Sequence, residues 1–236
     1  MGRFDSFSDA TLTTSAASAE RVSAFLRAVY GWMCVGLAVT AVVALYVSGT
    51  HWAMTIAANR WLLFLLFGVQ LGAVIAISAG ASRLAPGTAT LLFLGYSALT
   101  GVVFSYILLV YTGESIASTF FITAGMFGAM ALFGTSTSRS LAGWGQFLFM
   151  GLIGVVLAAV VGLFWQNDTM QFLIGFVGVI VFTGLTAYDA QRLKLMALAV
   201  PEGQAGSYAI AGALSLYLNF VNLFLSLLRL GGGRRD

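Results

Sequence analysis

Few ionisable side chains lie within the apolar segments of this 236-residue chain, and the clearest of them is Asp189. It ends an apolar run in the stretch FTGLTAYDAQRLK, residues 182–194. A charged side chain at membrane depth costs roughly 2.5–3.5 kcal/mol on insertion scales, so it is a candidate for an ion path or a proton-binding site. The structural alternative is a helix-end carboxylate that water reaches and that pairs with Arg192, one helical turn further along.

The last apolar segment carries polar side chains at helical spacing. They are Ser215, Asn219, Asn222, Ser226 and Arg229. Intervals of four, three, four and three residues place all of them on one face of a helix. Such a stripe cannot face lipid, where amides and hydroxyls find no partners. It predicts either a face that lines a watered cavity or a row of hydrogen bonds between helices, each worth about 0.6 kcal/mol.

Arg83 stands just past an earlier apolar segment, in the stretch SAGASRLAP. An arginine in that position usually extends its side chain to the lipid headgroups. On the orientation argued below, it shares the cytosolic side of the membrane with Asp189.

The residue types exclude several chemistries within a membrane. The one histidine, His51, lies in a connection, so a serine protease would have no base. Tyr188 and Asp189 resemble half of an aspartyl protease site, but no second acid follows within an apolar segment. The one lysine, Lys194, ends a helix and cannot form a retinal Schiff base, and the one cysteine, Cys34, excludes an internal disulfide. With neither metal-ligand spacing nor a phosphate-binding loop, we expect no enzyme, no cofactor and no metal centre.

The composition excludes a soluble globule. The chain is 60% hydrophobic and 8% charged, with a mean hydropathy of +0.96. Soluble domains are about 45–50% apolar and about 25% charged. The net charge of +3 comes from scattered basic residues, which does not indicate a nucleic-acid partner. The predicted class is an all-α polytopic membrane protein.

Seven continuous apolar stretches are each near the length of about 20 residues that crosses the hydrocarbon as a helix. They cover residues 28–47, 61–78, 89–110, 116–133, 147–164, 172–188 and 209–230. We therefore divide the chain into a polar cytosolic tail at 1–27, one seven-helix transmembrane domain at 28–230 and a short C-terminal tail at 231–236. The polar stripe places the seventh helix at the centre of the bundle.

The distribution of arginine and lysine sets the orientation, because these residues favour the cytosolic side. With a cytosolic N-terminus, seven lie inside: Arg3, Arg21, Arg27, Arg83, Arg139, Arg192 and Lys194. Four lie outside: Arg60, Arg229, Arg234 and Arg235. Seven spans put the C-terminus outside. If one of the seven segments enters and leaves the membrane on the same side, the C-terminus becomes cytosolic. The arginines at the C-terminus would also agree with that orientation.

Three stretches resemble the Bax inhibitor-1 family in its bacterial branch. They are YTGESIASTFFITAGMFGAMALFGTSTSRSLAGWGQFLFMGLIG at 111–154, FTGLTAYDAQRLK at 182–194 and ALSLYLNFVNLFLSLLRL at 213–230. The likeness extends from Glu20 to Gly231. It implies a multi-pass protein of the bacterial inner (plasma) membrane, with seven helices and the last surrounded by the other six.

The resemblance also implies a function. The family is associated with a pH-sensitive leak of calcium down its gradient, with suppression of cell death in eukaryotes and, in some bacterial members, with a membrane-bound protease. Two aspartates, on the sixth and seventh helices, form the pH sensor, and an arginine at the cytosolic end of the second helix latches onto them. Asp189 matches the sixth-helix aspartate through TAYDAQ, and Arg83 matches the arginine.

The seventh-helix position departs from this pattern, because the family's LYLDFIN is LYLNFVN here and the aspartate is Asn219. A glutamate common in the second helix is likewise replaced by Gln70. We expect Asp189 to lie close to Arg83, with Asn219 within hydrogen-bonding reach of Asp189. Two close carboxylates titrate in coupled steps, and that coupling is lost here, so we expect any leak to depend only weakly on pH between about 6 and 8.

Two hypotheses from different classes remain. The first is a cation leak channel or transporter for calcium or another cation, with Asp189 in its path. The second is a non-conducting membrane protein that modulates a membrane-bound protease or a stress response. The scarcity of acids in the predicted interior favours the second hypothesis, or a weakened form of the first. In either case membrane lipids surround the chain.

Overall fold

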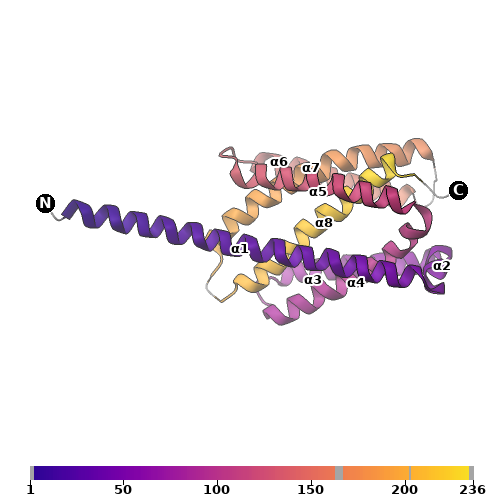
Figure 1. Cartoon of the computed structure of the whole chain (residues 1–236), viewed down its shortest axis with the longest axis horizontal. Helices are drawn as coiled ribbons and strands as arrows, with labels where there is room; N and C mark the ends of the chain where they lie inside the picture. The colour runs from indigo at the N-terminus through magenta and orange to yellow at the C-terminus, as the bar shows by residue number, and fades with distance from the viewer. Residues whose placement is uncertain (1–2, 163–166, 202, 234–236) are drawn as a thin grey trace.

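The computed structural model describes residues 3–162, 167–201 and 203–233, and the side chains of these apart from those of 3–16, 57, 60 and 63. Within this part of the chain the fold is entirely helical (Figure 1). The helices are α1 (Arg3–Ser48), α2 (His51–Ala58), α3 (Arg60–Gly80), α4 (Pro86–Val110), α5 (Gly113–Ser136), α6 (Ala142–Gly162), α7 (Asp168–Ala199) and α8 (Ala205–Gly231). Three arginines counted in the orientation argument lie outside the described part. They are Arg60, by its side chain alone, and Arg234 and Arg235 as whole residues.

Short polar residues and a proline start several helices. Asn59, Thr112 and Asn167 accept hydrogen bonds from backbone N–H groups in the first turns of α3, α5 and α7. These side chains occupy donors that a helix N-terminus leaves unpaired. Pro86 is the first residue of α4, where its missing N–H costs nothing.

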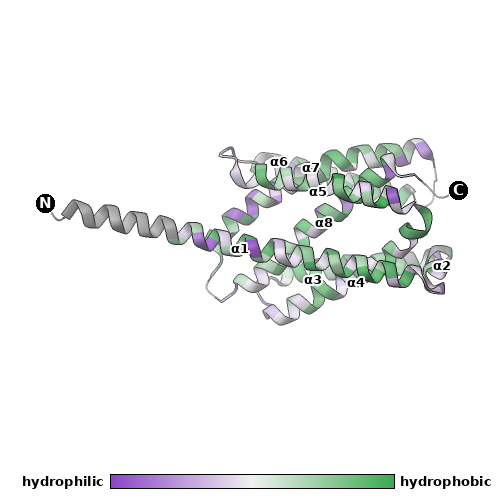
Figure 2. Ribbon diagram, in the orientation of Figure 1, coloured by the Kyte–Doolittle hydropathy of each residue, from purple (hydrophilic) through white to green (hydrophobic). Residues whose placement is uncertain are grey.

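Six of the helices are long and apolar enough to cross a membrane, and α3 contributes a shorter apolar helix at Phe64–Gly80. The six are Ala17–Ser48 within α1 and the whole of α4, α5, α6, α7 and α8. Many large apolar side chains on them are exposed, including Leu91, Phe121 and Leu157. Figure 2 shows hydrophobic residues, in green, along much of the length of the helices in the bundle. A lipid environment accounts for this exposure, which water would penalise.

The start of α1 differs from the prediction. Its helix begins at Arg3 rather than near Ala28, so the residues before the apolar run at 28–47 are helical as well. No glycine or proline occurs between residues 3 and 27, so nothing in the backbone interrupts the helix. Figure 1 shows α1 continuing well beyond the rest of the bundle.

The last helix, α8, lies inside the bundle. In the most apolar 18-residue stretch of α8, 67% is buried, against 22–44% in the other candidate spans. It packs on α1, α3, α4, α5 and α7. In Figure 1 it crosses diagonally between the group of α5, α6 and α7 and the group of α1, α3 and α4.

A buried hydrogen-bond network joins α8 to α1 and α4. The Tyr217 hydroxyl lies 2.6 Å from Thr40 Oγ1, and Thr40 Oγ1 lies 2.9 Å from the carbonyl oxygen of Ser97. All three residues are buried, and Phe93 and Tyr96 pack edge-on against the Tyr217 ring. This network holds three helices at one level of the bundle.

Contacts between α1 and α4 show that the two helices run parallel. Gly36 packs against Phe93, Thr40 against Ser97, and Val43 against Gly101. The residue numbers of the contacting pairs increase together along α1 and α4, so the two helices point the same way. The chain between them therefore returns, through α2 and α3, from the end of α1 to the start of α4.

Candidate functional site

The site is built on the contact between α7 and α8, which run antiparallel. Asn219 Nδ2 donates a hydrogen bond of 2.8 Å to Asp189 Oδ2. The side chain of Asp189 is 13% exposed and Asn219 is 5% exposed. The two residues are therefore within hydrogen-bonding reach, as predicted. A carboxylate that accepts a bond from an amide N–H gains a fixed orientation.

The cation beside Asp189 is Arg192. Arg192 Nη1 lies 3.8 Å from Asp189 Oδ1, and its side chain is 56% exposed. The residues are three apart on α7, so helix geometry keeps the arginine within reach. An ion pair open to water on one side contributes little to stability. This is the local pairing that the structural alternative for Asp189 predicts.

The predicted ion pair between Arg83 and Asp189 is wrong in this structure. Arg83 is exposed and lies in the turn after α3, where its backbone N–H donates to the carbonyl oxygen of Gly80. In the described part of the chain, the ion pair of Asp189 is with Arg192. Arg192 is held by its own helix, whereas Arg83 would have to order a long side chain in a turn, which costs conformational entropy.

A cavity of about 160 Å³ borders the carboxylate. Its walls come from the end of α3, from α7 and from the first half of α8. Ser78, Asp189 and Ser215 bring oxygen atoms to it, and Arg192 and Tyr208 also line it. Carboxylate, hydroxyl and water oxygens are ligands that calcium accepts. Among the described residues, no group of three His, Cys, Asp or Glu could hold a metal ion, so a cation here would meet one carboxylate.

The polar stripe on α8 divides into parts with different surroundings. Ser215 lines the cavity and Asn219 binds Asp189. Further along, Asn222 Nδ2 donates to the carbonyl oxygen of Leu218, and Ser226 Oγ donates to that of Asn222. Those two polar groups are satisfied by their own helix. One end of the stripe therefore lines the cavity, while its middle bonds within α8. The middle is neither the cavity face nor the row of hydrogen bonds between helices that the spacing predicted.

Two residues named in the sequence lie away from Asp189. Arg229 is half-buried near Tyr111, toward the C-terminal end of α8. Gln70, in the place of the family's glutamate, donates from Nε2 to Thr100 Oγ1 at 3.1 Å and so joins α3 to α4. Both residues belong to other parts of the bundle.

Gln191 has a positioning role that the sequence did not reveal, although it belongs to the TAYDAQ motif. Its Oε1 accepts a bond from the Leu141 N–H at 2.8 Å, and its Nε2 donates to the carbonyl oxygen of Arg139 at 2.9 Å. Both partners lie in the connection between α5 and α6. Gln191 therefore fixes that connection beside the residue pair at 189 and 192. Its position two residues after Asp189 in the same motif could have pointed to this role.

Comparisons with known proteins found a family model that matches most of the chain and several similar bacterial proteins. A family model described as "Inhibitor of apoptosis-promoting Bax1" matches residues 22–236. "Inner membrane protein YbhL" of Escherichia coli (strain K12) is 49% identical over 215 residues, which cover 89% of this chain and 92% of the relative. An uncharacterized protein of Borreliella burgdorferi is 41% identical over 215 residues, covering 90% and 93%. "Uncharacterized protein RP147" of Rickettsia prowazekii is 38% identical over 230 residues, covering 96% and 98%.

Proposed function

Because the chain belongs to the Bax inhibitor-1 family of multi-pass membrane proteins, we propose that it is a weak cation leak channel, with calcium as its cation and Asp189 in its path. The observation that carries the proposal is the hydrogen bond between Asn219 and Asp189 at the edge of a partly polar cavity. The family's second aspartate is replaced by an amide at this point. The proposed site therefore has one negative charge where the family pattern has two.

An amide partner suits both protonation states of the carboxyl group. When Asp189 is ionised, the Asn219 N–H donates to it. When Asp189 is protonated, its O–H can donate to the amide oxygen after the amide turns over. Two carboxylates lack this symmetry, because they repel each other when both are ionised. The pair between α7 and α8 is therefore retained as the pH changes, which supports a leak that is weakly dependent on pH.

The number of crossings is part of the proposal. We infer seven, with α3 as the second, because α1 and α4 point the same way and the chain between them has to return. α3 has 21 residues, a length of about 32 Å at 1.5 Å per residue, which matches the hydrocarbon thickness. The excess of arginine and lysine puts the N-terminus in the cytosol and the C-terminus outside.

A non-conducting role is the second candidate, and the same pair of residues favours it. A site with one carboxylate holds a divalent cation weakly, since affinity rises with the number of charged ligands. In that case the protein would act by contact with another membrane protein, such as a membrane-bound protease, and the Asn219–Asp189 bond would only join two helices.

Calcium uptake into liposomes that contain the purified protein separates the two candidates. The proposal expects uptake faster than in protein-free liposomes, with little change between about pH 6 and 8. Asp189→Asn keeps the shape of the side chain and removes its charge, so it should reduce uptake at every pH. Asp168→Asn is the matched control, because Asp168 is an exposed acid in the first turn of α7, and it should leave uptake unchanged. Uptake equal to that of protein-free liposomes would favour the non-conducting role.

A further inference from the structure

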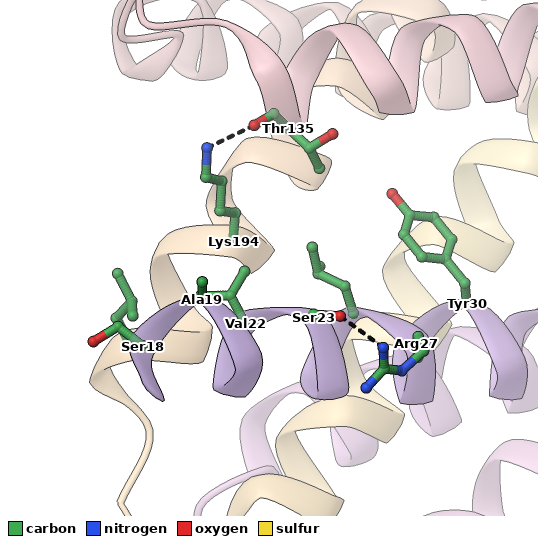
Figure 3. Close-up of a pocket in the computed structure, with 10 residues that line it drawn as sticks. Ser18, Ala19, Val22, Ser23, Arg27, Tyr30, Thr135 and Lys194 are labelled. Atoms are coloured by element: carbon green, nitrogen blue, oxygen red, sulfur yellow. Dashed lines mark hydrogen bonds between the residues drawn. The ribbon is translucent and has the colours of Figure 1, made fainter. Parts of the chain in front are cut away.

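A second, larger hollow lies at the end of the bundle where α1 extends outward. It is a groove of about 780 Å³ between α1, the end of α5 and the last part of α7 (Figure 3). Its lining is mostly apolar and includes Val22, Leu26 and Leu198. A volume of this size is typical of sites that take a small molecule or part of a lipid.

Two cations from different helices line this groove, Lys194 on α7 and Arg27 on α1. In Figure 3 Lys194 points toward Thr135, whereas Arg27 lies along α1 beside Ser23. Lys194 Nζ donates to the carbonyl oxygen of Thr135 at 2.7 Å, and Arg27 Nη1 donates to Ser23 Oγ at 2.8 Å (Figure 3). An ammonium group has three donors and a guanidinium group has five, so both keep donors for another partner. Within the described part of the chain, the lining of the groove contains no carboxylate. The groove therefore offers positive charge without an internal counter-ion.

The position of Arg27 fixes the depth of the groove in the membrane. Arg27 directly precedes the apolar run at 28–47, whose 20 residues make a helix of about 30 Å, the thickness of the hydrocarbon. Arg27 therefore lies at the boundary between hydrocarbon and headgroups. Tyr30 lines the groove on the hydrocarbon side of it, and Ser18 and Ser23 line it on the headgroup side. The groove thus runs across the boundary.

We propose that this groove binds one anionic phospholipid, with its phosphate at Lys194 and an acyl chain passing Tyr30 into the hydrocarbon. Arg27 would turn away from Ser23 to reach the same phosphate. The charge and the depth of the groove both match such a molecule. Basic pockets between helices on the cytosolic side bind anionic headgroups, and the cytosolic leaflet is rich in them. The site uses the proposed orientation of the chain and does not depend on ion conduction.

Native mass spectrometry of the detergent-purified full chain tests the site. The two probes are dioleoyl phosphatidylglycerol and dioleoyl phosphatidylcholine, which share their acyl chains and differ in net charge. We expect the wild type to retain one phosphatidylglycerol in preference to phosphatidylcholine. Each cation contributes roughly fivefold in affinity, so the double variant Arg27→Gln/Lys194→Gln should bind phosphatidylglycerol roughly 25-fold more weakly. Arg139→Gln, an exposed arginine at the same end of the bundle, should bind as the wild type does.

Ala19→Trp provides a second variant that keeps both cations. Ala19 is exposed and lines the groove, so a large side chain there fills space without disturbing the core. It should also reduce the retention of phosphatidylglycerol, at an unchanged melting temperature. Equal retention of the two lipids by the wild type would overturn the proposal and leave the groove to a polypeptide partner. An equal loss in Arg139→Gln would overturn it as well, because the attraction would then be general.

Discussion

Asn219 gives Asp189 a hydrogen-bond donor where a second aspartate would give it a second negative charge. The distance of 2.8 Å is that of an ordinary N–H···O bond, so the amide fits the carboxylate without strain. A second carboxylate at this distance could not remain ionised together with the first at low cost. We therefore expect the side chain at position 219 to decide whether the contact between α7 and α8 responds to protons.

The variant Asn219→Asp should make the leak dependent on pH. It places two carboxylates in hydrogen-bond contact, and such a pair takes up protons in two coupled steps. We expect calcium uptake by liposomes to change several-fold between about pH 6 and 8, where the wild type changes little. Uptake measured in half-unit steps of pH would show the difference.

Asn222→Asp is the control for that experiment. Asn222 lies one turn further along α8, and its amide bonds to the carbonyl oxygen of Leu218 rather than to Asp189. The variant adds the same charge to the same helix without forming the pair. A pH response in Asn222→Asp equal to that in Asn219→Asp would show that the response does not need two carboxylates at positions 189 and 219. So would a wild type that already switches steeply near neutral pH.

Small residues allow the helices of the bundle to approach closely. Gly134 on α5 lies against the backbone of Ala187 on α7, and a Cβ at Gly134 would overlap the Ala187 carbonyl group. Between α6 and α7, Gly145 lies against the side chain of Tyr188 and Gly184 against that of Leu148. Lipid provides no hydrophobic drive for helices to associate, so close packing of this kind holds them together.

Gly134→Ala should therefore destabilise the protein. The overlap involves a backbone group that cannot rotate away, and overpacking typically costs about 1–3 kcal/mol. Gly128→Ala, six residues earlier on α5, meets open space and should be neutral or stabilise by up to about 1 kcal/mol. Melting temperatures in detergent would compare the two variants. If they melt at the same temperature, the close contact between α5 and α7 does not contribute to stability.

Thr40→Val tests the network that joins α1 to α8. The change keeps the shape of the side chain and removes the hydroxyl that contacts Tyr217 and Ser97. Polar contacts between helices in membranes contribute about 0.6 kcal/mol on average and up to about 1.7 kcal/mol, so we expect a loss of free energy of unfolding in that range. Thr55→Val is the control, because the Thr55 hydroxyl is exposed and donates to the carbonyl oxygen of His51 in its own helix. Unfolding in mixed micelles would measure both, and equal losses would contradict a role for the network.

At the scale of the whole molecule, three helices share one direction. α1 and α4 run parallel, and α8 follows α4, since Tyr217 contacts Phe93 and Phe224 contacts Phe104. The backbone of Gly233, just after α8, pairs with Thr112 in the connection between α4 and α5. The C-terminal end of the described chain therefore lies at the end of the bundle where α1 and α4 finish.

Reporters at the two termini should accordingly lie on opposite sides of the membrane. We infer an odd number of crossings from the shared direction of α1 and α8, and the positive-inside rule favours a cytosolic N-terminus. A reporter that fluoresces only in the cytosol should be active at the N-terminus and inactive at the C-terminus. A third fusion in the connection between α5 and α6, at residues 137–141, should be active and checks that fusions of this chain insert normally. Activity at both termini would mean an even number of crossings.

The amino-acid sequence by itself determined the class of the protein, the positions of its apolar helices and the partnership of Asp189 with Asn219. The first two depend on how long each apolar run is, because the bilayer acts as a solvent for every helix whatever its neighbours are. The third came from motifs on two helices that the family places together. The polar stripe on α8 also indicated a helix inside the bundle, since lipid excludes such a face.

Only the tertiary structure decided which side chains complete the site. Arg192 rather than Arg83 pairs with Asp189, because a neighbour on the same helix is held in reach while a turn residue has to be ordered. Asn222 and Ser226 bond within α8, although their spacing equals that of the residues at the cavity. The groove with Arg27 and Lys194 joins helices far apart in the sequence. Spacing along one helix shows which residues share a face, but what that face meets depends on which helices pack against it.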